Sequence, residues 1–535
     1  MSNRPRVRPL LVAAAVSALI ATAAPKAFSQ TAEGSIYGRV AAGSTVTVTS
    51  EAIGITRTTA AQSDGSFNIS RLPAGTYTVS ADGRTTNVVV RIGTGSAADF
   101  NSLEEVTVAG MRQRTIDFTS TESNAVFTQE MVQQLPVPLN VNAVATLTPT
   151  VLRGDTGLGS GDLPSFAGSS VAENAYYING FDVTNIRNFL SYADLPYEAV
   201  AQQQVKAGGY GAEYGRSLGG VISLATKRGT NEWSGGVSVG MNPSGLQSSG
   251  QNVLSREPSE PGVYSLFQQP DNYNEFAIGA FVGGPIIQDR LFAFAMVQMN
   301  DTTDRNFGQT LATRESSSTP SGMLKLDWNI ADGHLLEATG IYNKKRTEYV
   351  DFTNATPFST SFDGNGGKSW THTGGHVGIL KYTGQLTDRL TFSALYGEVS
   401  DLTGVPVQGA RQEGLDCPVV LETNLAEIGC WPKPFPSVGV RLPGAPDVDE
   451  RTAWRADVEY QLGSHKLRAG YDAQSFESTE IGGSTFTGGI YYRYFPVGAS
   501  GVVNGVGGFQ PGTQVVRGRI VDSTSGTFAV DNNAF

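Results

Sequence analysis

The chain has 535 residues, more than one domain usually holds, and 64 of them are glycine. Charged residues make up only 16 %, and after the first 30 residues no stretch is apolar enough to cross a bilayer as a helix. The formal net charge of −11 argues against nucleic acid as a partner, because phosphate binding needs clustered lysine and arginine. A membrane-embedded chain of this composition would have to cross with strands that alternate apolar and polar residues.

The first 29 residues have the features of a secretory signal peptide. An arginine-rich start precedes an alanine-rich apolar run at residues 10–24. Ala27 and Ser29 then supply the small residues at positions −3 and −1 of a cleavage site before Gln30. We expect residues 1–29 to be removed on export. The alternative, an uncleaved anchor helix, is disfavoured by the short run.

Residues 34–100 predict a small all-β unit. Short β-branched runs are separated by turn signals, of which Asp64–Gly65 and residues 72–75 are the clearest, and this spacing favours a sandwich. The run TTAAQSDGSFNISRLPAGTYTVSADG at 58–83 resembles the carboxypeptidase regulatory-like domain, a transthyretin-like β-sandwich. Residues 34–100 contain neither His nor Cys, so zinc peptidase chemistry has no ligands there. We expect a structural or docking module.

Residues 101–232 predict a mixed α/β unit. A helix is expected at 128–135, with Thr128 as its N-cap and prolines directly after it. A second short helix is expected around 140–147, and a strand at 175–178. Glycine-rich turns follow, but no G-x-x-x-x-G-K-[ST] pattern occurs that would indicate a phosphate site.

Three segments of this unit carry a family resemblance. LEEVTVAG at 103–110 resembles a TonB box, and AYYINGFDVTN at 175–185 is similar to a later motif of a plug domain. PYEAVAQQQVKAGGYGAEYGRSLGGVISLATKRGTNEWSG at 196–235 resembles the end of such a plug. The order of sandwich and plug resembles the Oar-like subgroup of TonB-dependent outer-membrane receptors. The resemblance implies uptake of an extracellular ligand across the outer membrane, powered by TonB with ExbB and ExbD, without a cofactor and without enzyme activity.

The resemblance also implies roles for individual residues. Glu104, Glu105, Val106, Thr107 and Val108 are the candidate segment for TonB binding, because an extended segment can add as a strand to a partner's sheet edge. An ordinary plug-entry strand is the alternative.

Glu213 and Arg216 lie in GAEYGRSLGG, in the final section of the plug. Similar charges anchor the plug to the barrel wall in the family, so the resemblance implies a plug lock for this pair. A structural pair that forms because both residues are buried is an equal alternative.

Residues 233–535 have the rhythm of an antiparallel transmembrane β-barrel. Runs of about ten residues are joined in pairs by tight polar turns and separated by longer segments. The turns are expected at 287–290, 331–333, 387–388 and 463–464, and the long segments at 300–320, 347–374 and 401–451. Short turns on one side and long loops on the other are typical of outer-membrane proteins, so lipid of that membrane is an expected partner.

Alternation within the runs indicates which face meets lipid. Leu390, Phe392, Ala394 and Tyr396 are expected on one face of their strand. In the run at 452–462, Trp454, Ala456, Val458 and Tyr460 should meet lipid, while Ala453, Arg455, Asp457 and Glu459 should face a wet lumen.

Roughly eleven strands can be counted in 233–535, including weaker runs near 490–495 and 527–535. Plugged transporters use about 22 strands, and an open barrel would leave unpaired backbone groups in lipid. We therefore expect only part of a large barrel, in a truncated chain. An intact barrel of ten to twelve strands is the rival interpretation.

The remaining candidate sites involve cysteine and histidine. Cys417 and Cys430 form a lone close pair, which in an exported protein predicts a disulfide. His372 and His376 have no acidic or thiol neighbours, so no metal site is expected. Two alternatives to transport remain open: a signalling or adhesion receptor on the same barrel, and a soluble surface β-protein. The ligand is not readable from the sequence.

Overall fold

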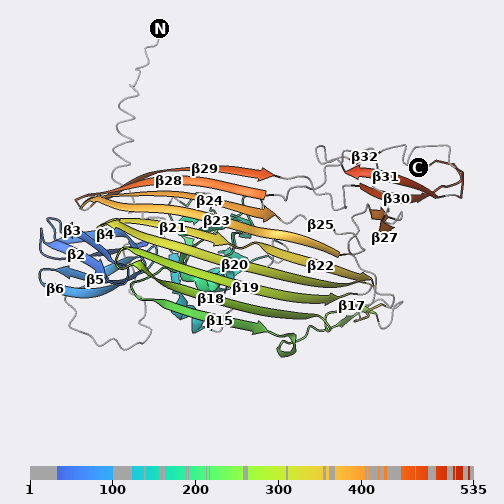
Figure 1. The fold of residues 1–535 in the computed structure, drawn as a ribbon, viewed down its shortest axis with the longest axis horizontal. Helices are drawn as coiled ribbons and strands as arrows, with labels where there is room; N and C mark the ends of the chain where they lie inside the picture. Colours follow the sequence, from blue (N-terminus) through green and yellow to red (C-terminus); the bar gives the residue numbers. More distant parts are fainter. Residues whose placement is uncertain are drawn as a thin grey trace, which may run out of the picture.

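The computed structural model describes residues 33–530 apart from 101–122, 257–262, 361–367, 409–418, 422–426, 431–447, 480–489, 503–509, 522–527 and shorter gaps of one to four residues. The chain forms an N-terminal sandwich, a central plug and a long antiparallel wall (Figure 1). Among the described residues, no helix is long and apolar enough to cross a membrane.

The N-terminal unit is a β-sandwich of two sheets, as the turn spacing predicts. One sheet has the order β4-β1-β7 and the other β3-β2-β5-β6. The strands are β1 (Glu33–Arg39), β2 (Thr45–Ser50), β3 (Ile55–Ala60), β4 (Ser66–Pro73), β5 (Gly75–Ala81), β6 (Arg84–Val90) and β7 (Gly95–Ala98). Alternate residues such as Val46, Val48 and Val79 fill a core of their own, which the wall joins through Leu335.

The plug has a five-stranded mixed sheet of order β12-β11-β14-β13-β8. Its strands are β8 (Ser123–Thr128), β11 (Ala175–Ile178), β12 (Phe181–Asp182), β13 (Val200–Gly208) and β14 (Val221–Thr226), and β9 (Val151–Arg153) pairs with β10 (Pro164–Phe166) beside it. Both predicted helices form, as α2 (Gln129–Gln133) and α3 (Val141–Ala145). The side chains of Thr128 and Asn140 cap them by accepting backbone N–H groups, which an open helix end leaves unpaired.

The wall is an antiparallel sheet that curves around the plug, with the sandwich at the end where the tight turns lie (Figure 1). Its main path is β15-β18-β19-β20-β21-β23-β24-β28-β29, and β22 and β25 extend it at one end. The bounds are β15 (Ser234–Asn242), β18 (Asn272–Ile287), β19 (Leu291–Phe307), β20 (Leu311–Ala331), β21 (His334–Tyr342), β22 (Lys345–Thr353), β23 (Lys368–Thr387), β24 (Leu390–Thr403), β25 (Val407–Gln408), β28 (Val448–Leu462) and β29 (His465–Thr479). The four tight turns fall where the sequence predicts them.

The prediction of a loop at 300–320 is wrong. β19 and β20 are 17 and 21 residues long and stay paired from the turn at 288–290 out to Phe307 and Ala312. Strand β22 likewise occupies part of the predicted loop at 347–374. The strands therefore continue well beyond the ten residues that a bilayer requires.

The expected alternation is confirmed on the wall. Trp454 is 55 % exposed and Val458 42 %, whereas Asp457 and Glu459 are each 6 % exposed. In β24, Tyr396 is exposed and its neighbour Leu395 is buried. The face predicted to meet lipid thus points away from the plug. The opposite face points toward the plug and carries the buried charges together with apolar residues such as Leu395.

The weak runs near 490–495 and 527–535 do not extend the wall, contrary to expectation. β30 (Ile490–Pro496), β31 (Gln514–Val521) and β32 (Phe528–Val530) form a separate sheet with β26 (Val419–Leu421) and β27 (Glu427–Cys430). Figure 1 places this sheet at the end of the molecule away from the sandwich. A further hairpin, β16 (Val253–Leu254) with β17 (Tyr264–Leu266), is also separate from the wall.

Candidate functional site

The plug is seated on the concave, inward face of the wall. One buried cluster joins plug side chains such as Ile178 and Leu195 to wall side chains such as Met323 and Ile379. Apolar burial of this kind is worth about 25 cal/mol per Å² and has no directional preference, so it holds the plug without specifying its position.

One close contact does specify position. Phe181 of the plug is 1 % exposed and lies against Gly397 of β24. A Cβ atom at Gly397 would come within 2.4 Å of the Phe181 ring. The wall therefore has a gap in its side chains at the point where this ring inserts.

Ion pairs hold the plug to strand β28. Arg451 is fully buried, pairs with the Asp182 carboxylate at 2.5 Å and donates to the Asp182 carbonyl at 2.7 Å. Arg187 of the plug pairs with Asp449 at 3.0 Å. Asn185 donates to the same Asp449 carboxylate at 3.3 Å. Each unit therefore contributes one arginine to this contact: Arg451 of the wall binds the plug, and Arg187 of the plug binds the wall.

A second ionic contact lies where the plug sheet ends. Arg228 follows β14 and pairs with Glu337 of β21 at 2.8 Å, and Asn179 donates to Thr339 of the same strand at 3.1 Å. Burial alone would lower the pKa of Arg228, but the carboxylates of Asp327 and Glu337 raise it above its usual value. Arg228 is therefore held as a cation against the wall.

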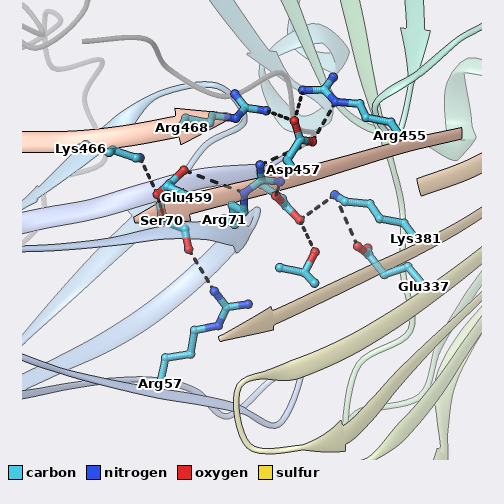
Figure 2. A network of polar contacts seen from close by, with 12 residues as sticks. Arg57, Ser70, Arg71, Glu337, Lys381, Arg455, Asp457, Glu459, Lys466 and Arg468 are labelled. Carbon is cyan, nitrogen blue, oxygen red and sulfur yellow. Dashed lines mark hydrogen bonds and ion pairs between the residues drawn. The ribbon is translucent and has the colours of Figure 1, made fainter. Parts of the chain in front are cut away.

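The sandwich joins the wall through a buried cluster of charges (Figure 2). Arg71 of β4 reaches Asp457 at 3.7 Å and Glu459 at 3.9 Å, both on β28. Glu33 of β1 accepts from Lys381 of β23 at 2.6 Å and lies 3.9 Å from Arg71. All five of these residues are buried.

The rim of the cluster comes from β28, β29 and the sandwich itself. Arg455 and Arg468 hold Asp457, and Lys466 holds Glu459 at 2.9 Å (Figure 2). Arg57 of the sandwich donates to the Ser70 carbonyl at 3.0 Å, and its burial lowers the pKa of the guanidinium.

Side chains at the turn end of the wall also bind the sandwich backbone. Asn231 donates to the Glu51 carbonyl at 2.6 Å, and Asn329 donates to the Ile53 carbonyl at 2.7 Å. Gln385 donates to the Thr58 carbonyl at 2.8 Å. These contacts fix the β2–β3 hairpin of the sandwich on the rim of the wall.

A polar cavity of about 440 Å³ lies between the plug and the far half of the wall. It is remote from the tight turns, because its wall residues come from the distal parts of the strands. Hydroxyl, amide and carboxyl groups line it, with a single lysine; they include Asp194, Tyr273, Asn300, Asp304, Glu315 and Lys345. The Asn343 side chain donates to the Asp194 carbonyl at 2.6 Å and so ties the plug to the rim of the cavity.

Most site residues predicted from the sequence lie outside the described residues. Residues 104–108, Glu213, Arg216 and Cys417 are all in this group. Cys430 ends β27 opposite Val419 in the backbone ladder. The TonB segment, the Glu213–Arg216 lock and the disulfide therefore stay predictions, as does the signal peptide.

His372 and His376 lie on one strand, β23, four residues apart. Four residues of strand span about 13 Å, whereas two nitrogens that bind one zinc ion each lie about 2 Å from it. Among the described residues, no group of three or more His, Cys, Asp or Glu is placed to hold a metal.

Sequence reasoning missed Glu33, Arg71, Arg228, Glu337 and Lys381 as interface residues. It did place Asp457 and Glu459 on the polar face of their strand. The sequence does contain a signal for those missed residues that lie within strands. They are charged residues at inward positions, where only a partner compensates for their burial. The sequence does not name that partner, since Glu33 and Lys381 are hundreds of residues apart.

Comparison with known proteins shows what parts of this chain are similar to. Residues 117–221 match the family model of the TonB-dependent Receptor Plug Domain. The chain is 27 % identical over 323 residues to the TonB-dependent transporter Oar of Myxococcus xanthus. That match covers 56 % of this chain and 29 % of Oar, so the chain spans well under half the length of that relative.

Similar solved structures include a receptor and an outer membrane transporter. A mutant of the ferric enterobactin receptor PfeA of Pseudomonas aeruginosa is 14 % identical with a TM-score of 0.44, over 74 % of this chain and 55 % of that one. The outer membrane transporter YddB of Escherichia coli is 14 % identical with a TM-score of 0.47, over 74 % and 53 %. The relatives are receptors and transporters, not enzymes. The chain therefore contains a region similar to the plug domain of TonB-dependent receptors, and over about half of its length it is similar to the TonB-dependent transporter Oar.

Proposed function

We propose that the protein resides in the outer membrane, binds an extracellular ligand and imports it with energy delivered by TonB, which acts with ExbB and ExbD. One observation carries this proposal. Among the described residues, no strand of the plug pairs with a strand of the wall. The plug is held by apolar contact and a few ion pairs, so it can be displaced without breaking a β-ladder. In this proposal the signal peptide at 1–29 directs export, and the turn end of the wall faces the periplasm.

Residues 104–108 are the proposed point of attachment for TonB. They follow β7 and precede β8 in the chain. Ile92, just before β7, packs with Val126 of β8 and Ala225 of β14, so the sandwich contacts the plug sheet close in sequence to this segment. A force applied there would pull the plug away from the cavity and toward the turn end. Strand addition to a TonB sheet edge would transmit that force through backbone hydrogen bonds.

The substitution Val106→Pro tests this proposal in the natural full-length protein. Proline removes a backbone N–H and so disrupts strand addition, whereas Val106→Ala keeps it. We expect Val106→Pro to abolish ligand uptake while ligand binding and the amount of protein in the outer membrane stay unchanged, and Val106→Ala to retain uptake. If uptake survives both Val106→Pro and deletion of residues 103–110, the protein is a signalling or adhesion receptor and not a transporter.

We infer that the ligand binds in the polar cavity of about 440 Å³. Ser317 is buried and faces this cavity, while the next residue, Ser318, is exposed on the opposite face of β20. Ser317→Trp would fill the cavity, and Ser318→Trp is its matched control. Growth of strains carrying each variant should be compared on iron, sugar and peptide sources. Growth on the transported nutrient should fail only with Ser317→Trp; equal growth of both strains on every source would exclude the cavity as the binding site.

A further inference from the structure

The buried charges of the plug, the wall and the sandwich form one alternating chain. Arg228 of the plug pairs with Glu337 at 2.8 Å, and Glu337 lies 3.7 Å from Lys381. Lys381 pairs with Glu33 of the sandwich at 2.6 Å. The plug and the sandwich therefore share two wall residues, Glu337 and Lys381, although Arg228 and Glu33 belong to different units.

The side chains of this chain of charges are shielded from water. Lys381 is 4 % exposed, Glu33 3 % and Glu337 7 %. Ion pairs that are shielded from water are screened far less than exposed pairs, so a change at one link is felt at the next. Lys381 has two acceptors that compete for it, one on the sandwich and one that also holds the plug.

We propose that the docked sandwich closes the receptor in addition to the plug. Release of the sandwich from the wall is coupled to release of the plug through Glu337 and Lys381. When Arg228 leaves with the plug, Glu337 loses its nearest cation and keeps Lys325 at 3.4 Å, so it attracts Lys381 more strongly. Glu33 then loses its nearest partner, and the sandwich is held less tightly. The coupling is reciprocal: an undocked sandwich leaves Lys381 to Glu337, which weakens the hold on Arg228.

The sandwich can undock as a folded body. Its two sheets form no ladder with the wall among the described residues, and its core is its own apart from contact with Leu335. Its apolar contact with the plug is small and consists of Ile92 packed with Val126 and Ala225. None of the side-chain nitrogens of Arg71 makes a hydrogen bond within the described part of the chain, and its three carboxylate contacts are 3.7–3.9 Å long. An interface built from shared charges is held less permanently than an apolar one, because a buried ion pair repays little more than its own desolvation.

Cross-linking measures this coupling in the full chain. Thr58 and Gln385 are in contact across the interface, and both can be changed to cysteine in a background with Cys417→Ser and Cys430→Ser. A short bis-maleimide then reports the docked fraction of the purified protein. We expect Arg228→Met to lower the rate of cross-linking by about fivefold or more, although Arg228 binds the wall. Arg228→Lys, which keeps the charge, should restore much of the rate.

Lys227→Met is the matched control. Lys227 is the adjacent plug cation and also contacts the wall, through the ring of Phe281 at 4.7 Å, but it is not part of the charge chain. It should leave the rate of cross-linking unchanged. In a Lys381→Met background, Arg228→Met should have no further effect. The proposal fails if Arg228→Met cross-links as fast as Lys227→Met, or if its effect persists in full without Lys381. The test requires neither a ligand nor TonB, so it stands apart from the proposal of import.

Discussion

Arg71 and Arg451 are among the largest side chains that the fold buries completely, and each reaches from one unit to another. Arg71 extends from the sandwich to the wall, and Arg451 from the wall to the plug. Transfer of a guanidinium out of water costs several kcal/mol, which its ion pairs return only in part. These arginines therefore define where the three units sit more than they add to overall stability.

The sequence indicates which face of a strand such a residue occupies, but it does not indicate which residue it pairs with. The alternation in 452–462 correctly places Asp457 on the polar face. That Asp457 meets Arg71 depends on where the sandwich docks, which no local pattern encodes. Arg71 also adopts a left-handed backbone, with φ of 55°, in a residue type that rarely does so.

The contact of Gly397 with the plug can be tested by substitution. Because its missing side chain accommodates the Phe181 ring, Gly397→Ala should displace that ring and destabilise the seated plug by about 1–3 kcal/mol. Gly378 on the adjacent strand is the control, since a Cβ there meets nothing within 4 Å. Urea titration of the purified protein in detergent would measure both. Equal urea midpoints for the two variants would contradict this account of the contact.

At the scale of the element, the sequence predicts where strands turn better than where they end. The turn at 331–333 forms around Gly333, whose positive φ of 76° suits glycine. The sequence predicts a loop at the outer ends of β19 and β20, because 311–320 is rich in serine and threonine and lacks apolar alternation. That alternation marks only the part of a strand that meets lipid, while β-branched polar residues continue the ladder beyond it.

The side of β23 assigned to lipid can be tested by substitution at two depths. Leu380 and Leu386 are exposed on the same face, and Leu386 lies six residues nearer the tight turn. Arginine costs about 2–4 kcal/mol at the middle of the bilayer and about 0–1 kcal/mol near its surface. Leu380→Arg should therefore lower the membrane-inserted fraction strongly and Leu386→Arg little. Heat-modifiable mobility in gels of outer-membrane fractions would report this difference, and an equal loss for both would refute the assigned lipid face.

For the whole molecule, the arrangement is three separately built units with charged contacts between them. The sandwich, the plug and the wall each have their own sheets. The sandwich has a core of its own, whereas the plug shares its core with the wall. The plug is therefore bound to the wall more tightly than the sandwich is. The ion pairs of β28 add to the apolar contact of the plug.

Arg451 tests whether those pairs hold the plug. Arg451→Met leaves the Asp182 carboxylate, which is 11 % exposed, without its closest cation, and breaking a buried pair costs about 3–5 kcal/mol. We expect the plug of the full-length protein to leave at a lower urea concentration, seen as large conductance steps in planar bilayers. Arg455 lies four residues along the same face and pairs at 2.8 Å with Asp457 of its own strand, so Arg455→Met should open the pore no earlier than the parent. If the two variants open alike, apolar packing alone seats the plug, because both changes remove one inward arginine from the same strand.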